Sequence, residues 1–196
     1  MTVSIPLFPL NTVLFPGGVL PLRIFEPRYL DMVSNCLRSG TGVGVILIKE
    51  GSEVGNAAQP HDIGTMASIC YWNKRDDGLL GITLKGEQRF KIHSQNIEPN
   101  QLIVAEVELL PDAAELPVLS EYQYLVDLLK TTLEQLEPPY TTMATHYDNA
   151  SWVCARLVEL LPMHLTEKQW FLQADDPLDR LAELSTRLQE KKYIQM

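Results

Sequence analysis

The spacing of the hydrophobic residues changes near Pro111, and this change constrains the fold more than any other feature. Before Pro111, short β-branched and aromatic runs alternate with prolines and glycines, which is typical of strands and turns. After it, apolar residues recur every three or four positions, the spacing of one face of an α-helix. The sequence therefore predicts a β-rich part over residues 1–111 and a helical part over residues 112–196.

The strongest strand signal lies between Ile82 and Ile92, where apolar and polar residues alternate. Such alternation predicts one buried and one exposed face. Residues 63–73 are also β-rich, and the intervening Asp77-Gly78 favours the positive φ of a tight turn, so these two strands are expected to pair. Residues 101–110 predict a further strand, and residues 42–50 predict a strand buried on both faces. A compact β barrel or sandwich follows.

One helix is expected to interrupt these strands. Apolar residues between Arg28 and Arg38 lie close to a helical stripe, Pro27 suits the first turn, and Gly40 lies beyond the end. The fold class is therefore α+β, with one helix inserted among the strands.

About four helices are expected in the second part, packed on each other and on the sheet. Their expected apolar faces include Trp152, Leu157, Leu160, Leu161, Trp170, Phe171, Leu178, Leu181, Leu184 and Leu188. The first helix is predicted by an apolar stripe over residues 118–136 with a capping-box spacing at Ser120–Gln123, and the second runs from about Asp148 to Leu161. A second capping-box spacing at Thr166–Gln169 predicts the start of the third helix. Asp176-Pro177 predicts the start of the fourth, because Asp is a good cap and Pro suits the first turn.

The charge balance argues against general nucleic-acid binding. The 196 residues carry a net charge of -9 at pH 7, which repels a phosphate backbone. Residues 1–111 hold nine Lys and Arg against eleven Asp and Glu, a net charge of -2, whereas residues 112–196 hold seven against fourteen, a net charge of -7. The acidic excess therefore lies mostly in the helical part.

The cysteines and the start of the chain predict a cytoplasmic location. Cys36, Cys70 and Cys154 are scattered and odd in number, and Cys70 and Cys154 lie in apolar runs, so buried reduced thiols are favoured over disulfides. The first ten residues lack a basic region followed by a continuous apolar stretch, and the longest aliphatic run, Val45 to Ile48, is far shorter than a bilayer span. Neither export nor membrane insertion is expected.

Metal, cofactor and acid–base sites are not expected. The four histidines have no close metal-ligand spacing and the cysteines form no C-x2-C pair. The segment Gly81 to Gly86 continues with Glu87 in place of the lysine of a nucleotide-binding loop, and Gly40 to Gly44 follows a helix where dinucleotide binding requires a strand. His61-Asp62 is interpreted as an ordinary loop pair, and Glu106 and Glu108 as a solvated strand face.

The most informative polar residues are Arg23, Glu26 and Arg28, which lie in an apolar segment. In one interpretation, Glu26 bridges one of the arginines and stabilises the strand-to-helix turn, because charges in apolar surroundings are costly unless paired. In the other, an exposed arginine lies beside aromatic rings at the rim of a groove that holds an extended peptide. The sequence leaves both open, and the candidate peptide-binding residues are Phe15, Arg23, Phe25, Glu26, Arg28 and Tyr29.

Several segments resemble one known family in their order along the chain. Residues 5–29 read IPLFPLNTVLFPGGVLPLRIFEPRY, and DIGTMA at 62–67, DG at 77–78, LKGEQRF at 84–90, LLP at 160–162 and EKQ at 167–169 follow. Together they resemble the stand-alone Lon N-terminal (substrate-binding) domain family over nearly the whole chain. The resemblance implies a PUA-like pseudobarrel of strands followed by a small helical bundle, in agreement with the change of period near Pro111.

The resemblance also implies a function. Lon proteases hold their P-loop ATPase and their Ser-Lys peptidase in later domains, and no matching segment occurs in these 196 residues. The leading hypothesis is therefore a non-enzymatic module that binds unfolded or extended polypeptide, or a specific protein partner, through a groove between the pseudobarrel and the helices. Such a module could serve as an adaptor or as a decoy for a protease, and its oligomeric state is left open.

Two alternatives come from other functional classes. One is a small hydrolase or peptidase-related enzyme, against which the absent nucleophile segment argues. The other is a PUA-like nucleic-acid binder, suggested by fold analogy alone. That alternative requires a local basic groove, for which the sequence offers Arg75, Lys85, Arg89 and Lys91.

Overall fold

The structure is a computed structural model that describes residues 2–191. It divides into two compact units, residues 1–112 and residues 113–196, and each unit is described by itself. Strands make up most of the first unit and helices most of the second, so the fold is α+β as predicted. None of the helices within the described residues combines the length and the apolar content needed to span a bilayer.

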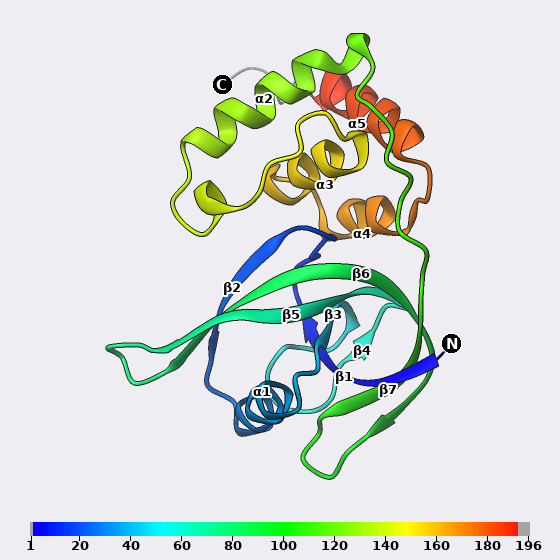
Figure 1. The fold of residues 1–196 in the computed structure, drawn as a ribbon. Helices are drawn as coiled ribbons and strands as arrows, with labels where there is room; N and C mark the ends of the chain where they lie inside the picture. Colours follow the sequence, from blue (N-terminus) through cyan, green and yellow to red (C-terminus); the bar gives the residue numbers. More distant parts are fainter. Residues whose placement is uncertain (1, 192–196) are drawn as a thin grey trace. The chain divides into compact units, whose positions relative to one another are not determined.

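The first unit is built on a closed ring of strands (Figure 1). The strands β1, β7, β6, β5 and β3 are hydrogen-bonded in that order, and parallel pairing between β1 and β3 closes the ring. The other pairings are antiparallel, with β2 attached to β6 and β4 to β3. The elements are β1 (Thr2–Leu10), β2 (Val19–Ile24), α1 (Pro27–Ser39), β3 (Val43–Glu50), β4 (Gln59–Pro60), β5 (Ile63–Lys74), β6 (Leu80–Ile97) and β7 (Ile103–Leu109).

The predicted hairpin is confirmed, because β5 and β6 pair from Ile63↔Lys91 to Lys74↔Leu80. Gly78 in the connecting turn has a φ of 82°, the left-handed conformation for which the Asp-Gly pair was a signal. The hairpin extends away from the ring (Figure 1).

The strict alternation predicted for β6 is wrong at two residues, because Thr83 and Arg89 are buried although they were expected on the exposed face. Pro21 and Tyr71 flank Thr83 in the neighbouring strands and share its face of the sheet. At Arg89, the chain beyond β7 continues the pairing with β6, because the Leu110 amide donates a hydrogen bond to the Arg89 carbonyl over 2.8 Å. Both positions therefore lie between paired segments, with β2 and β5 beside Thr83 and with β5 and the end of β7 beside Arg89.

The inserted helix α1 begins and ends where the sequence predicts. Pro27 is its first residue, and Gly40 ends it with a φ of 67°. Its buried face joins one hydrophobic cluster with residues of β1, β2, β3, β5 and β6, and a second cluster fills the ring between β1, β3, β6 and β7. The strand β3 is buried on both faces from Val43 to Ile48, which confirms that prediction.

The three cysteines are free thiols, as expected. Cys36 and Cys154 are buried, but Cys70 is exposed, so its predicted burial is wrong. The reason lies in the length of β5, which pairs with β3 only as far as Ala67 and then continues into the projecting hairpin.

The second unit contains the four α-helices that the sequence predicts. Asp176 caps the last of them, accepting hydrogen bonds from the amides of Leu178 (2.8 Å) and Asp179 (3.0 Å). The helical elements are η1 (Ser120–Tyr122), α2 (Gln123–Glu134), η2 (Tyr140–Thr142), α3 (Ala150–Leu160), α4 (Leu165–Gln173) and α5 (Pro177–Lys191). The buried side chains of these helices include Leu125, Leu129, Trp152, Leu157, Phe171, Leu181, Leu184 and Leu188.

Two predicted capping boxes are wrong. Residues 120–122 form a 3-10 turn without a side-chain cap, so α2 begins later than expected, at Gln123. The helix α4 begins at Leu165, before the predicted cap Thr166, and Glu167 instead accepts a hydrogen bond from the amide of His164 over 3.1 Å. The capping box of α4 therefore lies two residues earlier than predicted, between His164 and Glu167, whereas the start of α2 has no side-chain cap.

Trp170 departs from its predicted place in the core, because 42% of its surface is exposed. Successive residues of an α-helix point about 100° apart. The buried face of α4 holds the adjacent Phe171 and Leu172 and leaves Trp170 at its edge, where the guanidinium of Arg187 lies 5.1 Å from the ring centre.

Candidate functional site

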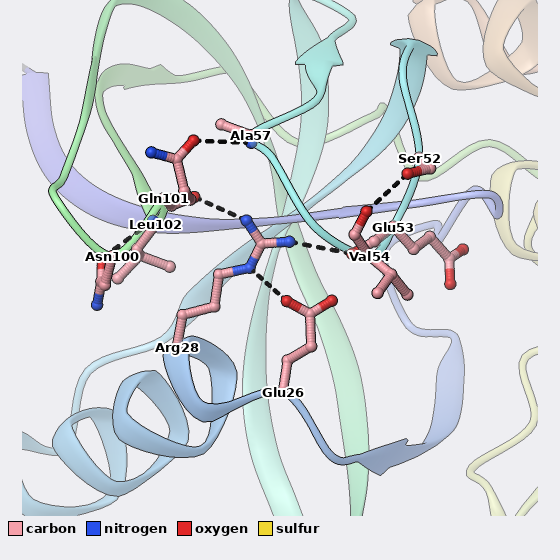
Figure 2. A network of polar contacts seen from close by, with 9 residues as sticks. All are labelled: Glu26, Arg28, Ser52, Glu53, Val54, Ala57, Asn100, Gln101 and Leu102. Atoms are coloured by element: carbon pink, nitrogen blue, oxygen red, sulfur yellow. Dashed lines mark hydrogen bonds and ion pairs between the residues drawn. The ribbon is translucent and has the colours of Figure 1, made fainter.

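Arg28, in the first turn of α1, is the centre of a buried polar network (Figure 2). Its side chain is 4% exposed, and its Nε lies 2.9 Å from Oε2 of Glu26. Nη1 donates a hydrogen bond to the carbonyl of Gln101 over 2.9 Å, and Nη2 donates one to the carbonyl of Glu53 over 3.2 Å. The predicted ion pair between Glu26 and one of the arginines is therefore present, and it joins the end of β2 to the start of α1.

The network connects segments that are far apart in the sequence. Glu53 belongs to the loop between β3 and β4, residues 51–58, and Gln101 belongs to the turn between β6 and β7. Gln101 has a positive φ of 69°, and its Oε1 accepts a hydrogen bond from the amide of Ala57 over 3.2 Å. Figure 2 shows these contacts converging on Arg28. Arg28 and Gln101 together hold loop 51–58 in place.

A pocket lies beside this network, with a volume of about 70 Å³. Its walls come from the end of β1, the second half of β2, the start of α1 and loop 51–58. Phe25, immediately after β2, is 57% exposed. The lining residues are mostly apolar: Phe8, Leu10, Leu22, Arg23, Ile24, Phe25, Glu26, Tyr29, Glu53 and Val54.

Four of the six candidates named from the sequence line this pocket: Arg23, Phe25, Glu26 and Tyr29. Arg28 does not line it but supports its walls through Glu26 and Glu53.

Phe15, the remaining candidate, is 1% exposed and lies in the interior. Its segment packs against β6 at Gly86, where a Cβ atom would clash with the Phe15 carbonyl oxygen. The Gly17 amide donates a hydrogen bond to the Gly86 carbonyl over 2.8 Å. Phe15 therefore anchors the chain between β1 and β2 and is not available to a ligand in this structure.

The pocket carries charges of both signs. Glu53 Oε1 accepts a hydrogen bond from the amide of Asn11 over 2.5 Å, and Arg23 lines the pocket from an exposed position on β2. Tyr29 stacks on Phe8 with ring centroids 4.4 Å apart, and burial raises the pKa of its phenol. Tyr29 therefore stays neutral near pH 7 and contributes packing surface, not acid–base chemistry.

Glu53, Val54 and Gln101 contribute to the site but were not predicted. Glu53 and Gln101 reach Arg28 across 25 and 73 residues of sequence, respectively. No local pattern signals such a contact, because the loop residues are ordinary polar and small residues. Phe8 and Leu10 lie in the apolar opening segment, and their place beside Arg23 follows from the closure of the ring.

Two further findings concern metal-ligating and acid–base groups. Residues 2–191 contain no group of three or more His, Cys, Asp or Glu side chains positioned to hold a metal ion. Burial and the nearby Lys49 lower the pKa of His61, and Asp62 offsets part of this effect.

The residues proposed for a basic groove differ in burial and in ion pairing. Arg89 is buried, Arg75 lies 3.4 Å from Asp77, and Lys85 lies 3.9 Å from Glu87. Two of the four positive charges are thus close to a carboxylate, and a third is inside the protein.

Similarity to known proteins covers almost the whole chain. Residues 4–190 match the family model of the ATP-dependent protease La (LON) substrate-binding domain. Lon protease of Flavobacterium johnsoniae is 26% identical over 93% of this chain and 23% of its own length, and Lon protease 1 of Bdellovibrio bacteriovorus is 28% identical over 96% of this chain and 25% of its own length. The chain therefore spans about a quarter of the length of these relatives.

Two solved structures are also similar. The Lon N-terminal domain protein from Xanthomonas campestris is 35% identical, with a TM-score of 0.78 over 94% of this chain and 98% of that one. The N-terminal domain of the Mycobacterium avium complex Lon protease is 18% identical with a TM-score of 0.61, a likeness of fold alone. With a family model matched from residue 4 to residue 190, this chain belongs to the family of ATP-dependent protease La (Lon) substrate-binding domains.

Proposed function

We propose that this chain recognises extended or unfolded polypeptide at the pocket beside Phe25 and does not itself cleave what it binds. The observation that carries the proposal is an exposed aromatic ring at the mouth of a mostly apolar pocket whose walls are fixed by a buried ion pair. A large exposed apolar side chain costs solubility, and its placement at a pocket is typical of a recognition surface.

The size of the pocket suits a single side chain. About 70 Å³ accommodates a few water molecules or one apolar side chain. Pockets for small-molecule ligands and cofactors are commonly about 300–1,000 Å³. A polypeptide that inserts one residue and lays its backbone along the rim fits these dimensions better than an enclosed substrate or cofactor.

Family membership supports the same function, because substrate binding is the role for which the matched domain is named. The match extends over residues 4–190, so almost all of these 196 residues are accounted for by a binding domain. We further propose that the chain passes the bound polypeptide to a separate protease or withholds it as a decoy. The free thiols support a reducing compartment such as the cytoplasm.

The proposal is tested by fluorescence anisotropy with a labelled protein that is kept unfolded by reduction and alkylation of its cysteines. We expect saturable binding without added nucleotide, and mass spectrometry should find the probe intact. Phe25→Ala should weaken binding at least fivefold. Because Phe25 is exposed, the thermal midpoint should stay within about 2 °C of the wild-type value.

The matched control is Ile97→Ala at the end of β6, because Ile97 is also 57% exposed but does not line the pocket. This variant should bind the unfolded probe like the wild type. Equal losses in the two variants, or no binding by the wild type, would contradict the proposal.

A further inference from the structure

The strand β2 has one edge that no other described strand occupies. Within residues 2–191 it pairs only with β6, from Val19↔Lys85 to Ile24↔Leu80. An unpaired edge presents backbone amide and carbonyl groups that can pair with another extended chain. The edge is six residues long and contains Pro21, which lacks an amide hydrogen, so it can pair with a short segment only.

The free edge and the pocket lie on the same part of β2. Leu22 and Ile24 line the pocket and, as alternate residues of a strand, share one face of the sheet. In a strand added beside β2, a side chain directly opposite Leu22 or Ile24 would lie on that same face. Such a side chain would therefore be positioned at the pocket.

We infer that the bound polypeptide adds as a short strand to the free edge of β2 and places one apolar side chain in the pocket. This inference rests on the proposed function and specifies how the polypeptide is held. Backbone hydrogen bonds would supply affinity for any sequence, and the pocket would select the anchored residue.

The opposite face of β2 selects the ligand residue that is next to the one in the pocket. Arg23 pairs in register with Gly81, and Gly81 pairs with Asn73. The side chain of Arg75 lies over Gly81, because a Cβ atom there would be 3.3 Å from Arg75 Cγ. Arg23 and the side chain of Arg75 are therefore on the same face of the sheet formed by β2, β6 and β5.

The carboxylate of Asp77 interacts with both Arg75 and Arg23. Asp77 lies 3.4 Å from Arg75, and both arginines help to lower the pKa of Asp77, although the amide of Leu79 is the largest cause. Two positive charges against one negative charge leave this face cationic. A ligand residue opposite Arg23 should therefore be Asp or Glu.

The pocket favours an apolar side chain, because most of its lining is apolar. Its charged lining residues do not add up to one sign: Glu26 is paired with Arg28, Glu53 accepts a hydrogen bond from the Asn11 amide, and Arg23 also lines the pocket. The expected ligand is thus an extended segment in which an apolar residue such as leucine follows or precedes an acidic residue.

Selective N-methylation tests strand addition, because an added strand uses alternate amides for pairing. The probe is a fluorescein-labelled, acetylated peptide with the sequence Thr-Val-Thr-Glu-Leu-Thr-Val-Thr. Two further versions each carry N-methyl groups on two alternate residues, one version at odd-numbered and the other at even-numbered positions of the peptide. We expect one version to lose at least tenfold in affinity while the other stays within about threefold of the parent.

Equal effects of the two methylation patterns would overturn strand addition. So would failure of the parent peptide to bind while the unfolded protein probe still binds, and in that case the proposed function stands. If neither the peptide nor the unfolded probe binds, the proposed function itself fails.

A charge exchange tests the cationic face. Arg23→Glu should weaken binding of the parent peptide about threefold to fivefold, and a peptide with Lys in place of Glu should regain most of that loss, since cross-strand charge pairs are of this modest size. The control Lys49→Glu makes the same change in net charge on an exposed part of β3. An equal loss in Arg23→Glu and Lys49→Glu would contradict the assignment of Arg23.

Discussion

Each unit of this protein buries an arginine in an ion pair, but the surroundings of the two arginines differ. In the second unit, Arg156 is 1% exposed, its Nε lies 2.8 Å from Oε2 of Glu159, and Lys168 donates a hydrogen bond to the Glu159 carbonyl over 2.7 Å. These contacts join α3 to α4 in the interior of the helical unit. In the first unit, Arg28 instead joins the end of a strand, a loop and a turn around an open pocket.

The difference teaches that a buried arginine is not by itself a sign of a binding site. Burial lowers the pKa of Arg156, and Glu159 partly restores it. The lowered pKa reflects the free-energy cost of burying a charge, here in a structural ion pair. Around Arg28 the same kind of pairing holds loop 51–58 beside an exposed aromatic residue. In the proposed function, the exposed neighbours contact the polypeptide and Arg28 positions them.

The largest expected effect comes from removing Arg156. Arg156→Ala takes the guanidinium away from the Glu159 carboxylate, so the free energy of unfolding should fall by about 3–5 kcal/mol in urea titrations. The protein that remains folded should bind the unfolded probe with unchanged affinity. A loss of less than about 1 kcal/mol would break the comparison, because Arg156 would then not be a structural centre of its unit.

Arg28→Lys should have a smaller effect on stability and a larger one on binding. Lysine keeps the charge but cannot reproduce the fork that reaches Glu53 and Gln101, so we expect a loss of about 2 kcal/mol. Loop 51–58 would lose its support, and polypeptide affinity should fall at least threefold under conditions where the variant is folded. Unchanged affinity in that variant would show that the network does not position the pocket.

Gln101→Ala isolates the support of the loop from the charge of Arg28. It removes the acceptor for the Ala57 amide and leaves the Arg28 contact with the residue 101 carbonyl available. The free energy of unfolding should fall by about 1 kcal/mol, and hydrogen exchange should quicken in residues 51–58. Exchange that quickens equally throughout the protein would argue against a local role.

The smallest expected effect is a pH dependence in the first unit. The pKa of His61 lies below its usual 6.5, so the unfolded chain binds more protons than the folded chain between the two values. Stability contributed by neutral His61 should therefore be lost as the pH falls through 6.5. Since the ring is only partly buried, we expect a few tenths of a kcal/mol, measured as the difference between wild type and His61→Gln in urea titrations at about pH 7.5 and 5.5.

Much of the fold is predictable from local patterns. The β5–β6 hairpin follows from alternation and an Asp-Gly turn, and α1 follows from its apolar stripe between Pro27 and Gly40. The Glu26–Arg28 ion pair follows from the cost of leaving charges unpaired among apolar residues. Each of these features is determined within a few residues of sequence or by one physical requirement.

The remaining features depend on contacts between distant segments. Thr83 and Arg89 look exposed in the sequence, but both are buried in the sheet, between segments that are distant in the sequence. Phe15 looks like a candidate ligand contact, yet the missing side chain of Gly86 lets its segment pack into the interior. Glu53 joins the pocket only because loop 51–58 folds back onto Arg28.

Hydrogen–deuterium exchange with and without the unfolded probe tests the central claim most directly, because it reports both units in one experiment. Polypeptide recognition beside Phe25 predicts slower exchange in residues 19–29 and 51–58 on binding, with no comparable change around Arg156 in α3. Protection confined to the helical unit, or binding without protection of residues 19–29, would contradict the account.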